Sequence, residues 1–183
     1  ARAEAAKPLF DDVNLERLAR LIENGAPAEL KAQMVSAPLE AVRSEPLLSF
    51  AIQEASSSSY RPAEKLECVR ALVEAGAPLD RLLKASTPVH GTASNTGNPA
   101  MLRYLFEHGV DPNVRDPHFD RPYLFDAVQS SMDPAGSVLV FLEFGADPNA
   151  KAVFDEQDGP ITPLIRAAQF GRWRVCAALI DKG

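Results

Sequence analysis

The sequence predicts an all-α protein built from repeated pairs of helices, and three observations lead to this fold class. Apolar residues recur at helical spacing in five segments of the chain, and each of these segments ends at a glycine. Hydrophobic residues make up 46% of the 183 residues, which is enough for a sizeable core. Disorder is therefore not expected. The longest apolar stretches, such as 138–142, are far shorter than the roughly 20 residues that a membrane-spanning helix needs.

The five helical segments share one design, an apolar stripe that closes at a glycine, the residue that most easily takes the left-handed conformation after a helix. They are 15–26, 68–77, 101–110, 138–146 and 175–183. Their closing glycines, at positions 25, 76, 109, 145 and 183, are separated by 51, 33, 36 and 38 residues. Such spacing is typical of solenoids made of stacked repeats. We therefore expect about five repeats.

A second motif precedes the helical segments and predicts where the first helix of each repeat begins. It is clearest in Thr87-Pro88-Val89-His90 and in Thr162-Pro163-Leu164-Ile165, with weaker versions at 45–48 and 121–124. Threonine can cap a helix through its hydroxyl, and proline suits the first helical position because its missing N–H would have no partner there.

These openings resemble the T-P-L-H-x-A motif of the ankyrin repeat family, and two turns strengthen the resemblance. Gly109-Val110-Asp111-Pro112-Asn113 and Gly145-Ala146-Asp147-Pro148-Asn149 are similar to the turn that leads into the projecting finger loop of that family. The resemblance covers residues 45–183 and is weaker before them. It implies a solenoid of helix-turn-helix repeats with finger loops, divergent from the family pattern and with insertions.

We expect one domain, 1–183, that departs from the regular repeat at two places. Glu29 to Ser36 is rich in helix formers and lies between two prolines, which predicts a short extra helix. The second repeat is about ten residues longer than the family period allows, and the polar run Ser56 to Pro62 predicts an exposed loop between its helices. The expected parts are an atypical N-terminal cap 1–26, an inserted segment 27–44, repeat 2 at 45–79 with insertion 56–65, repeat 3 at 86–116, repeat 4 at 120–151 and repeat 5 at 161–183.

Side chains able to do chemistry are few and scattered, so we expect neither catalysis, a metal nor a cofactor. The histidine of the 87–90 opening has a structural role in the family, and the three histidines show no metal-ligand spacing. Cys68 and Cys176 fall in helical stripes three repeats apart, which predicts two buried, unbridged thiols. A net charge of −6 argues against nucleic acid as a partner.

The fingers of the third and fourth repeats are the predicted binding site. Phe119 and Phe154 interrupt polar turns and could anchor a partner, although packing under their own fingers is an equal alternative. The segments 111–120 and 147–158 carry net charges of −2 and −3. The carboxylates expected to steer a basic partner are Asp116, Asp120, Asp155, Glu156 and Asp158. Trp173, at the start of the last helix, is expected to cover the edge of the core.

The family resemblance implies that the chain binds another protein, one with a basic or mixed basic and apolar surface, rather than catalysing a reaction. We expect a monomer that binds neither nucleic acid nor membrane. The composition resembles that of bacterial proteins, which leaves open an effector or a toxin-neutralising immunity protein. A regulatory or targeting part of a larger enzyme and a structural spacer also stay open. No leader pattern is visible, so we expect a cytoplasmic location, with secretion or a periplasmic location after signal removal as the alternative.

Overall fold

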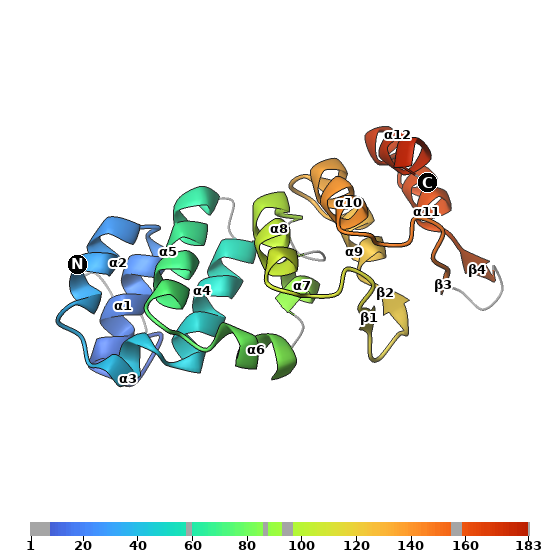
Figure 1. Ribbon diagram of the computed structural model, residues 1–183. Coiled ribbons are helices and arrows are strands. Elements are labelled where there is room, and N and C mark those ends of the chain that lie inside the picture. Colours follow the sequence, from blue (N-terminus) through green and yellow to red (C-terminus); the bar gives the residue numbers. More distant parts are fainter. Residues whose placement is uncertain (1–7, 58–59, 86–87, 93–96, 155–158, 183) are drawn as a thin grey trace, which may run out of the picture. The chain divides into compact units, whose positions relative to one another are not determined.

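A computed structural model describes residues 8–57, 60–85, 88–92, 97–154 and 159–182 of the chain (Figure 1). Its internal contacts form two compact units, Ala1–Lys84 and Ala85–Gly183. Helices dominate both units, and short strands occur in the second. The prediction of an all-α repeat protein with finger loops is therefore confirmed. The predicted limits of the single domain and of its repeats stay predictions.

The first unit is a bundle of short helices around a core of leucine and isoleucine. Its helices are α1 (Val13–Glu23), α2 (Pro27–Met34), α3 (Leu39–Val42), α4 (Glu45–Ser57), α5 (Pro62–Glu74) and α6 (Leu79–Ala85). Helix α4 packs against α1 and α5, and α2 packs against α1 and α5. Leu18, Ile22, Leu30, Leu48 and Leu72 are fully buried at these contacts. Helix α2 is the extra helix that the 29–36 segment predicts.

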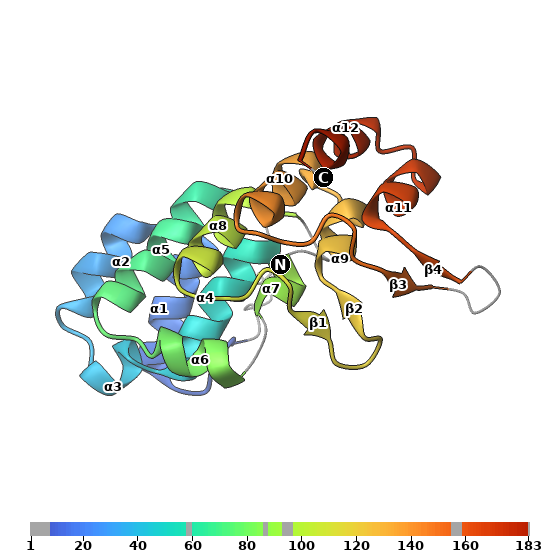
Figure 2. The same ribbon diagram turned by 45° about the vertical axis from the view of Figure 1, so that its right-hand side comes forward.

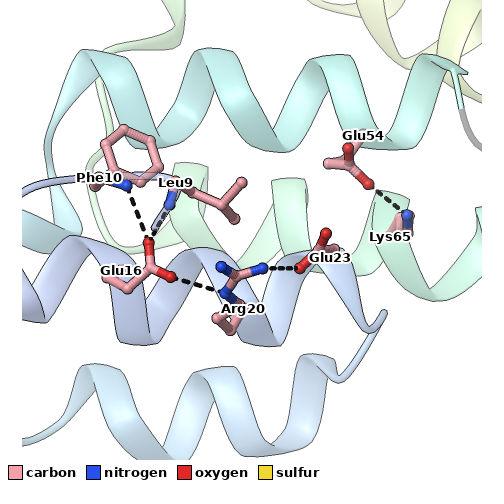
Figure 3. A network of polar contacts seen from close by, with 7 residues as sticks. All are labelled: Leu9, Phe10, Glu16, Arg20, Glu23, Glu54 and Lys65. Carbon is pink, nitrogen blue, oxygen red and sulfur yellow. Dashed lines mark hydrogen bonds and ion pairs between the residues drawn. The ribbon is translucent and has the colours of Figure 1, made fainter. Parts of the chain in front are cut away.

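The start of α1 is held by its own acidic residues (Figure 3). Asp12 caps the helix by accepting the N–H groups of Asn14 and Leu15. One carboxylate oxygen of Glu16 accepts the backbone N–H groups of Leu9, at 2.6 Å, and Phe10, at 2.9 Å. The segment before α1 is thereby fastened to the first turn of the helix.

The extra residues of the second repeat lengthen its helices, so the expectation of an exposed loop from Ser56 to Pro62 is wrong at both ends. Ser56 is buried within α4, and its hydroxyl donates to the carbonyl of Ile52 at 2.6 Å. Pro62 is the first residue of α5. Both helices have 13 residues, whereas α9 and α11 of the second unit have six and seven. Where the two long helices meet, the positive charge of buried Lys65 on α5 is compensated by Glu54 on α4. The ammonium lies 2.5 Å from a carboxylate oxygen of that residue (Figure 3).

The second unit repeats a helix pair followed by a hairpin. It contains α7 (Pro88–Gly91), α8 (Pro99–Glu107), β1 (Arg115–Asp116), β2 (Arg121–Pro122), α9 (Leu124–Gln129), α10 (Pro134–Glu143), β3 (Ala152–Val153), β4 (Pro160–Ile161), α11 (Pro163–Gln169) and α12 (Trp173–Lys182). Side-chain oxygens of Asn98, Asp133 and Thr162 cap α8, α10 and α11, each directly before a proline at the helix start. The capping role predicted for Thr162 is confirmed. Thr87 lies outside the described residues.

Two antiparallel hairpins form the fingers of this unit (Figure 2). In the first, Arg115 is paired with Pro122 and Asp116 with Arg121; in the second, Ala152 is paired with Ile161 and Val153 with Pro160. Strands β2 and β3 also contact each other, so the fingers lie side by side. The turns that lead into them close α8 and α10 at Gly109 and Gly145, whose φ angles are +90° and +91°. In this left-handed region glycine is favoured over every residue with a Cβ.

Candidate functional site

The first finger presents one aromatic side chain at its tip, and Asp116 shapes the turn that does so. The carboxylate of Asp116 accepts the N–H groups of His118, at 2.7 Å, and Phe119, at 3.0 Å. Asp116 is only 6% exposed, whereas Phe119 is 69% exposed. The expectation that Asp116 steers a partner from an exposed position is therefore wrong: burial withdraws its charge from the surface, and its hydrogen bonds make it a positioning residue for Phe119.

Asp120 is exposed, as expected, but its charge is already compensated. Its carboxylate accepts a hydrogen bond from Nε of Arg115 at 2.6 Å, and its backbone has a φ of +47°. Aspartate tolerates this conformation better than most residues. The other three predicted carboxylates, Asp155, Glu156 and Asp158, lie outside the described residues, and their role stays a prediction.

Phe154, directly after β3, is half-buried and packs under its own finger, which is one of the two alternatives that the sequence left open; its role as an anchor for a partner stays a prediction. One side of its ring packs on the small core formed by Phe125, Ala152 and Ile161. Its ring centroid lies 5.4 Å from that of Phe125. The guanidinium groups of two arginines, Arg121 and Arg166, lie near the ring as well, at 4.8 Å and 3.9 Å from its centroid.

These contacts belong to a row of alternating aromatic and cationic side chains, which we call the arginine–aromatic row. It consists of Phe119, Arg121, Phe154, Arg166 and Phe170. The end contacts are those of Arg121 with Phe119, at 5.5 Å, and of Arg166 with Phe170, at 4.6 Å. Cation–π contacts of this length are stabilising. The row joins both fingers to α11 and its C-cap, and Phe170, at its far end, is 48% exposed.

The two arginines differ in their polar partners. Arg121 donates from Nη2 to the buried carboxylate of Asp126 at 3.0 Å. Arg166 donates instead to the amide oxygens of Gln129, at 2.9 Å, and Gln169, at 3.3 Å. Within the described part of the chain, Nε of each arginine is buried without an acceptor. Burial lowers the pKa of Arg166 below its ordinary value, and the nearby charge of Arg121 lowers it further.

Sequence reasoning missed Arg121, Arg166 and Phe170 as site residues. A usable signal was present, because Arg166 follows the Thr162-Pro163 opening by three positions and therefore stands on the first helix of its repeat. The first helix, together with the finger, forms the binding side in the family that the sequence resembles.

Trp173 does not cover the core, contrary to expectation, because it is 72% exposed. It lines a pocket of about 360 Å³ with Met132, Asp133, Arg172 and Arg174. The pocket lies where the loop before α10 meets the start of α12. No residue of the arginine–aromatic row is among the residues that line this pocket.

Both cysteines are buried, as the helical stripes predict. Burial raises the pKa of the Cys68 thiol to about 11. Among the residues that the structure describes, no group of three or more His, Cys, Asp or Glu side chains could hold a metal ion. Over the same residues, no helix is both long enough and apolar enough to cross a bilayer.

Comparison with known proteins gives one finding. A family model for the ankyrin repeat matches residues 86–117, which include α7, α8 and β1. No curated protein matches the chain. The matched segment contains both motifs that carry the sequence resemblance, and the same helix pair, turn and hairpin recur in the second unit after it. The chain therefore contains an ankyrin repeat, at residues 86–117.

Proposed function

We propose that this chain acts by binding another protein, without catalysis, and that the arginine–aromatic row is its recognition surface. Ankyrin repeats generally serve as protein-binding modules, and repeat solenoids use extended surfaces of this kind to hold partners. The row contains three aromatic rings and two arginines on two fingers and one helix, all within the second unit.

The observation that carries the proposal is the exposure of aromatic rings at both ends of a preorganised row. Phe119 and Phe170 are 69% and 48% exposed, although large aromatic side chains usually bury most of their surface. Aromatic and arginine side chains dominate binding hot spots. Because the arginines are already stacked on the rings, little side-chain entropy is lost when a partner binds.

The second finger adds an electrostatic element to the proposal. Asp155, Glu156 and Asp158 follow Phe154 in the sequence. We retain for them the steering of a basic group on the partner, which speeds association more than it strengthens the complex. The partner surface that fits both elements is mixed, with apolar residues opposite the row.

The experiment that tests this function is quantitative affinity capture from a lysate of the source organism with four baits. These are the wild-type chain, Phe119→Ala, Phe170→Ala and the control Tyr60→Ala, which removes an equally exposed ring (61%) from the first unit. A hot spot contributes about 2 kcal/mol or more, which corresponds to about 30-fold in affinity. We expect the same protein to be lost from both phenylalanine baits and retained by the tyrosine bait. If all four baits capture the same proteins equally, the row is not the recognition surface. Melting curves of the four baits show whether they remain folded.

A further inference from the structure

Among the described residues, the side chains of the arginine–aromatic row and their bonded partners carry one more positive charge than negative charge. Arg121 and Arg166 contribute two positive charges, and Asp126 contributes one negative charge, all three from half-buried or buried side chains. Asp126 is bonded to Arg121, while the described partners of Arg166 are the neutral amides of Gln129 and Gln169. Among the residues that the structure describes, the unmatched charge is therefore located on Arg166.

The position of the Arg166 guanidinium is fixed from several sides. Phe154 and Phe170 lie 3.9 Å and 4.6 Å from it. Gln129 is itself oriented, because its Nε2 donates to the carbonyl of Phe125 at 3.0 Å and leaves Oε1 to accept from Arg166. An arginine does not lose its proton in a protein, so its charge has to be met by an acceptor. A rigid, partly desolvated guanidinium of this kind binds anions well.

One of its two amide contacts is easily exchanged. Gln169 is exposed at the end of α11, and its oxygen lies 3.3 Å from Nη1, which is long for a hydrogen bond to a cation. A carboxylate oxygen in its place would form a charge-assisted bond, roughly twice as strong as a neutral one. The exchange requires only that an exposed glutamine side chain turn towards solvent.

We propose that Arg166 anchors an acidic side chain of the partner protein, Asp or Glu, with apolar partner residues lying on Phe119 and Phe170. This inference rests on the proposed function and specifies the partner's chemistry. The charge count favours a carboxylate over a phosphate group. A single negative charge neutralises the cation that is unmatched among the described side chains, whereas a doubly charged phosphate leaves an excess negative charge beside buried Asp126.

The first experiment selects a random peptide display library on the full chain. The library is also selected on Arg166→Gln and on the control Arg174→Gln, which makes the same change at an exposed arginine of α12. We expect wild type and Arg174→Gln to enrich peptides that hold Asp or Glu beside an apolar residue, and Arg166→Gln to lose that preference. Arg166→Lys, which keeps the charge but not the planar fork, should retain the acidic preference with weaker binding. This variant keeps the test decisive if Arg166→Gln does not fold.

The second experiment shows whether the contact is direct. A synthetic peptide from the selection is measured with its acid and with the corresponding amide, against wild type and Arg166→Gln. We expect each single change to weaken binding about tenfold and the combined change to weaken it no further, since one charge pair is lost in all three cases. Additive effects would overturn the inference, as would tenfold tighter binding of a phosphoserine version.

The two proposals fail in different ways. Peptides that depend on Phe119 and Phe170 but show no acidic preference overturn the role of Arg166 and leave the recognition surface intact. Peptides that ignore both phenylalanines, or no enrichment on the wild-type chain, overturn the recognition surface and this inference with it.

Discussion

The side chain of Asn113 holds the turn that contains Asp147, 34 positions further along the chain. Its Oδ1 accepts the N–H of Asp147 at 2.9 Å, and its Nδ2 donates to the carbonyl of Gly145 at 3.0 Å. One asparagine thus links the turn after α8 to the turn after α10. Asn149 ends the second turn in the same motif position, but its side chain has no hydrogen-bond partner among the described residues.

Replacing Asn113 by alanine should therefore destabilise the second unit, whereas Asn149→Ala is a matched control. Two hydrogen bonds at an exposed site contribute about 1 to 2 kcal/mol together. We expect Asn113→Ala to lower the free energy of unfolding by that amount in urea denaturation, and Asn149→Ala to change it by less than about 0.5 kcal/mol. Equal losses in the two variants would mean that the link between turns contributes nothing.

Asp116→Ala should both loosen the first finger and weaken binding through Phe119. Removing a buried charged acceptor leaves two N–H groups unbonded and costs about 2 kcal/mol. Asp120→Asn is the control, since asparagine tolerates a positive φ and the lost ion pair with Arg115 is exposed. We expect a lower melting temperature for Asp116→Ala alone. A steering role would instead show as unchanged stability and slower association in stopped-flow measurements.

Glu16 should make the stability of the chain depend on acid pH. Its pKa lies below the ordinary value of 4.5, chiefly because the carboxylate accepts the N–H of Phe10. Burial is the next largest effect and opposes this, while the N–H of Leu9 and the side chain of Arg20 lower the pKa further. Since the unfolded chain binds this proton more readily, the contribution is complete above pH 4.5 and is lost as the pH falls through the folded-state pKa. Unfolding free energies of wild type and Glu16→Gln, measured from pH 7 to pH 3, should converge towards the acid end. Parallel curves would contradict the prediction.

Cys68 should be nearly inert towards thiol reagents while the chain is folded. With burial raising its pKa from 9.0 to about 11, the thiolate fraction at pH 8 falls on the order of 100-fold. The variant Cys176→Ala isolates this thiol. We expect its reaction with a disulfide reagent at pH 8 to be at least that much slower in buffer than in urea. A comparable rate in both would show that the helix pair α4–α5 opens readily.

Local signals were sufficient to predict much of the second unit. Gly109 and Gly145 close helices where the apolar stripes end, and Thr162 caps α11, because each of these roles depends on a few neighbouring residues. The serine run beginning at Ser56 was misleading for a related reason. Serine favours loops on average, yet its hydroxyl can satisfy itself on the carbonyl four residues earlier and remain in a helix.

The arginine–aromatic row could not be predicted in this way, because none of its contacts is set by local periodicity. Arg166 and Phe154 belong to a helix and a finger, and they meet only when the hairpin folds back beside α11. The charge count along the sequence was likewise insufficient. It treats Asp116 and Asp120 as equal carboxylates, although hydrogen bonding in the folded chain buries one and pairs the other.

The turns at Gly109 and Gly145 have a consequence for chemical synthesis. A Cβ built at either position meets no atom within 4 Å, so the space beside both glycines is open. What excludes an ordinary alanine is the φ near +90° alone, a conformation that suits a residue of the opposite hand. A chain assembled with D-alanine at these two positions should fold unchanged and gain stability, about 0.4 to 1 kcal/mol at each, because its unfolded state has fewer conformations to lose. At these helix ends the backbone conformation selects for chirality, while the space beside each glycine admits a methyl group.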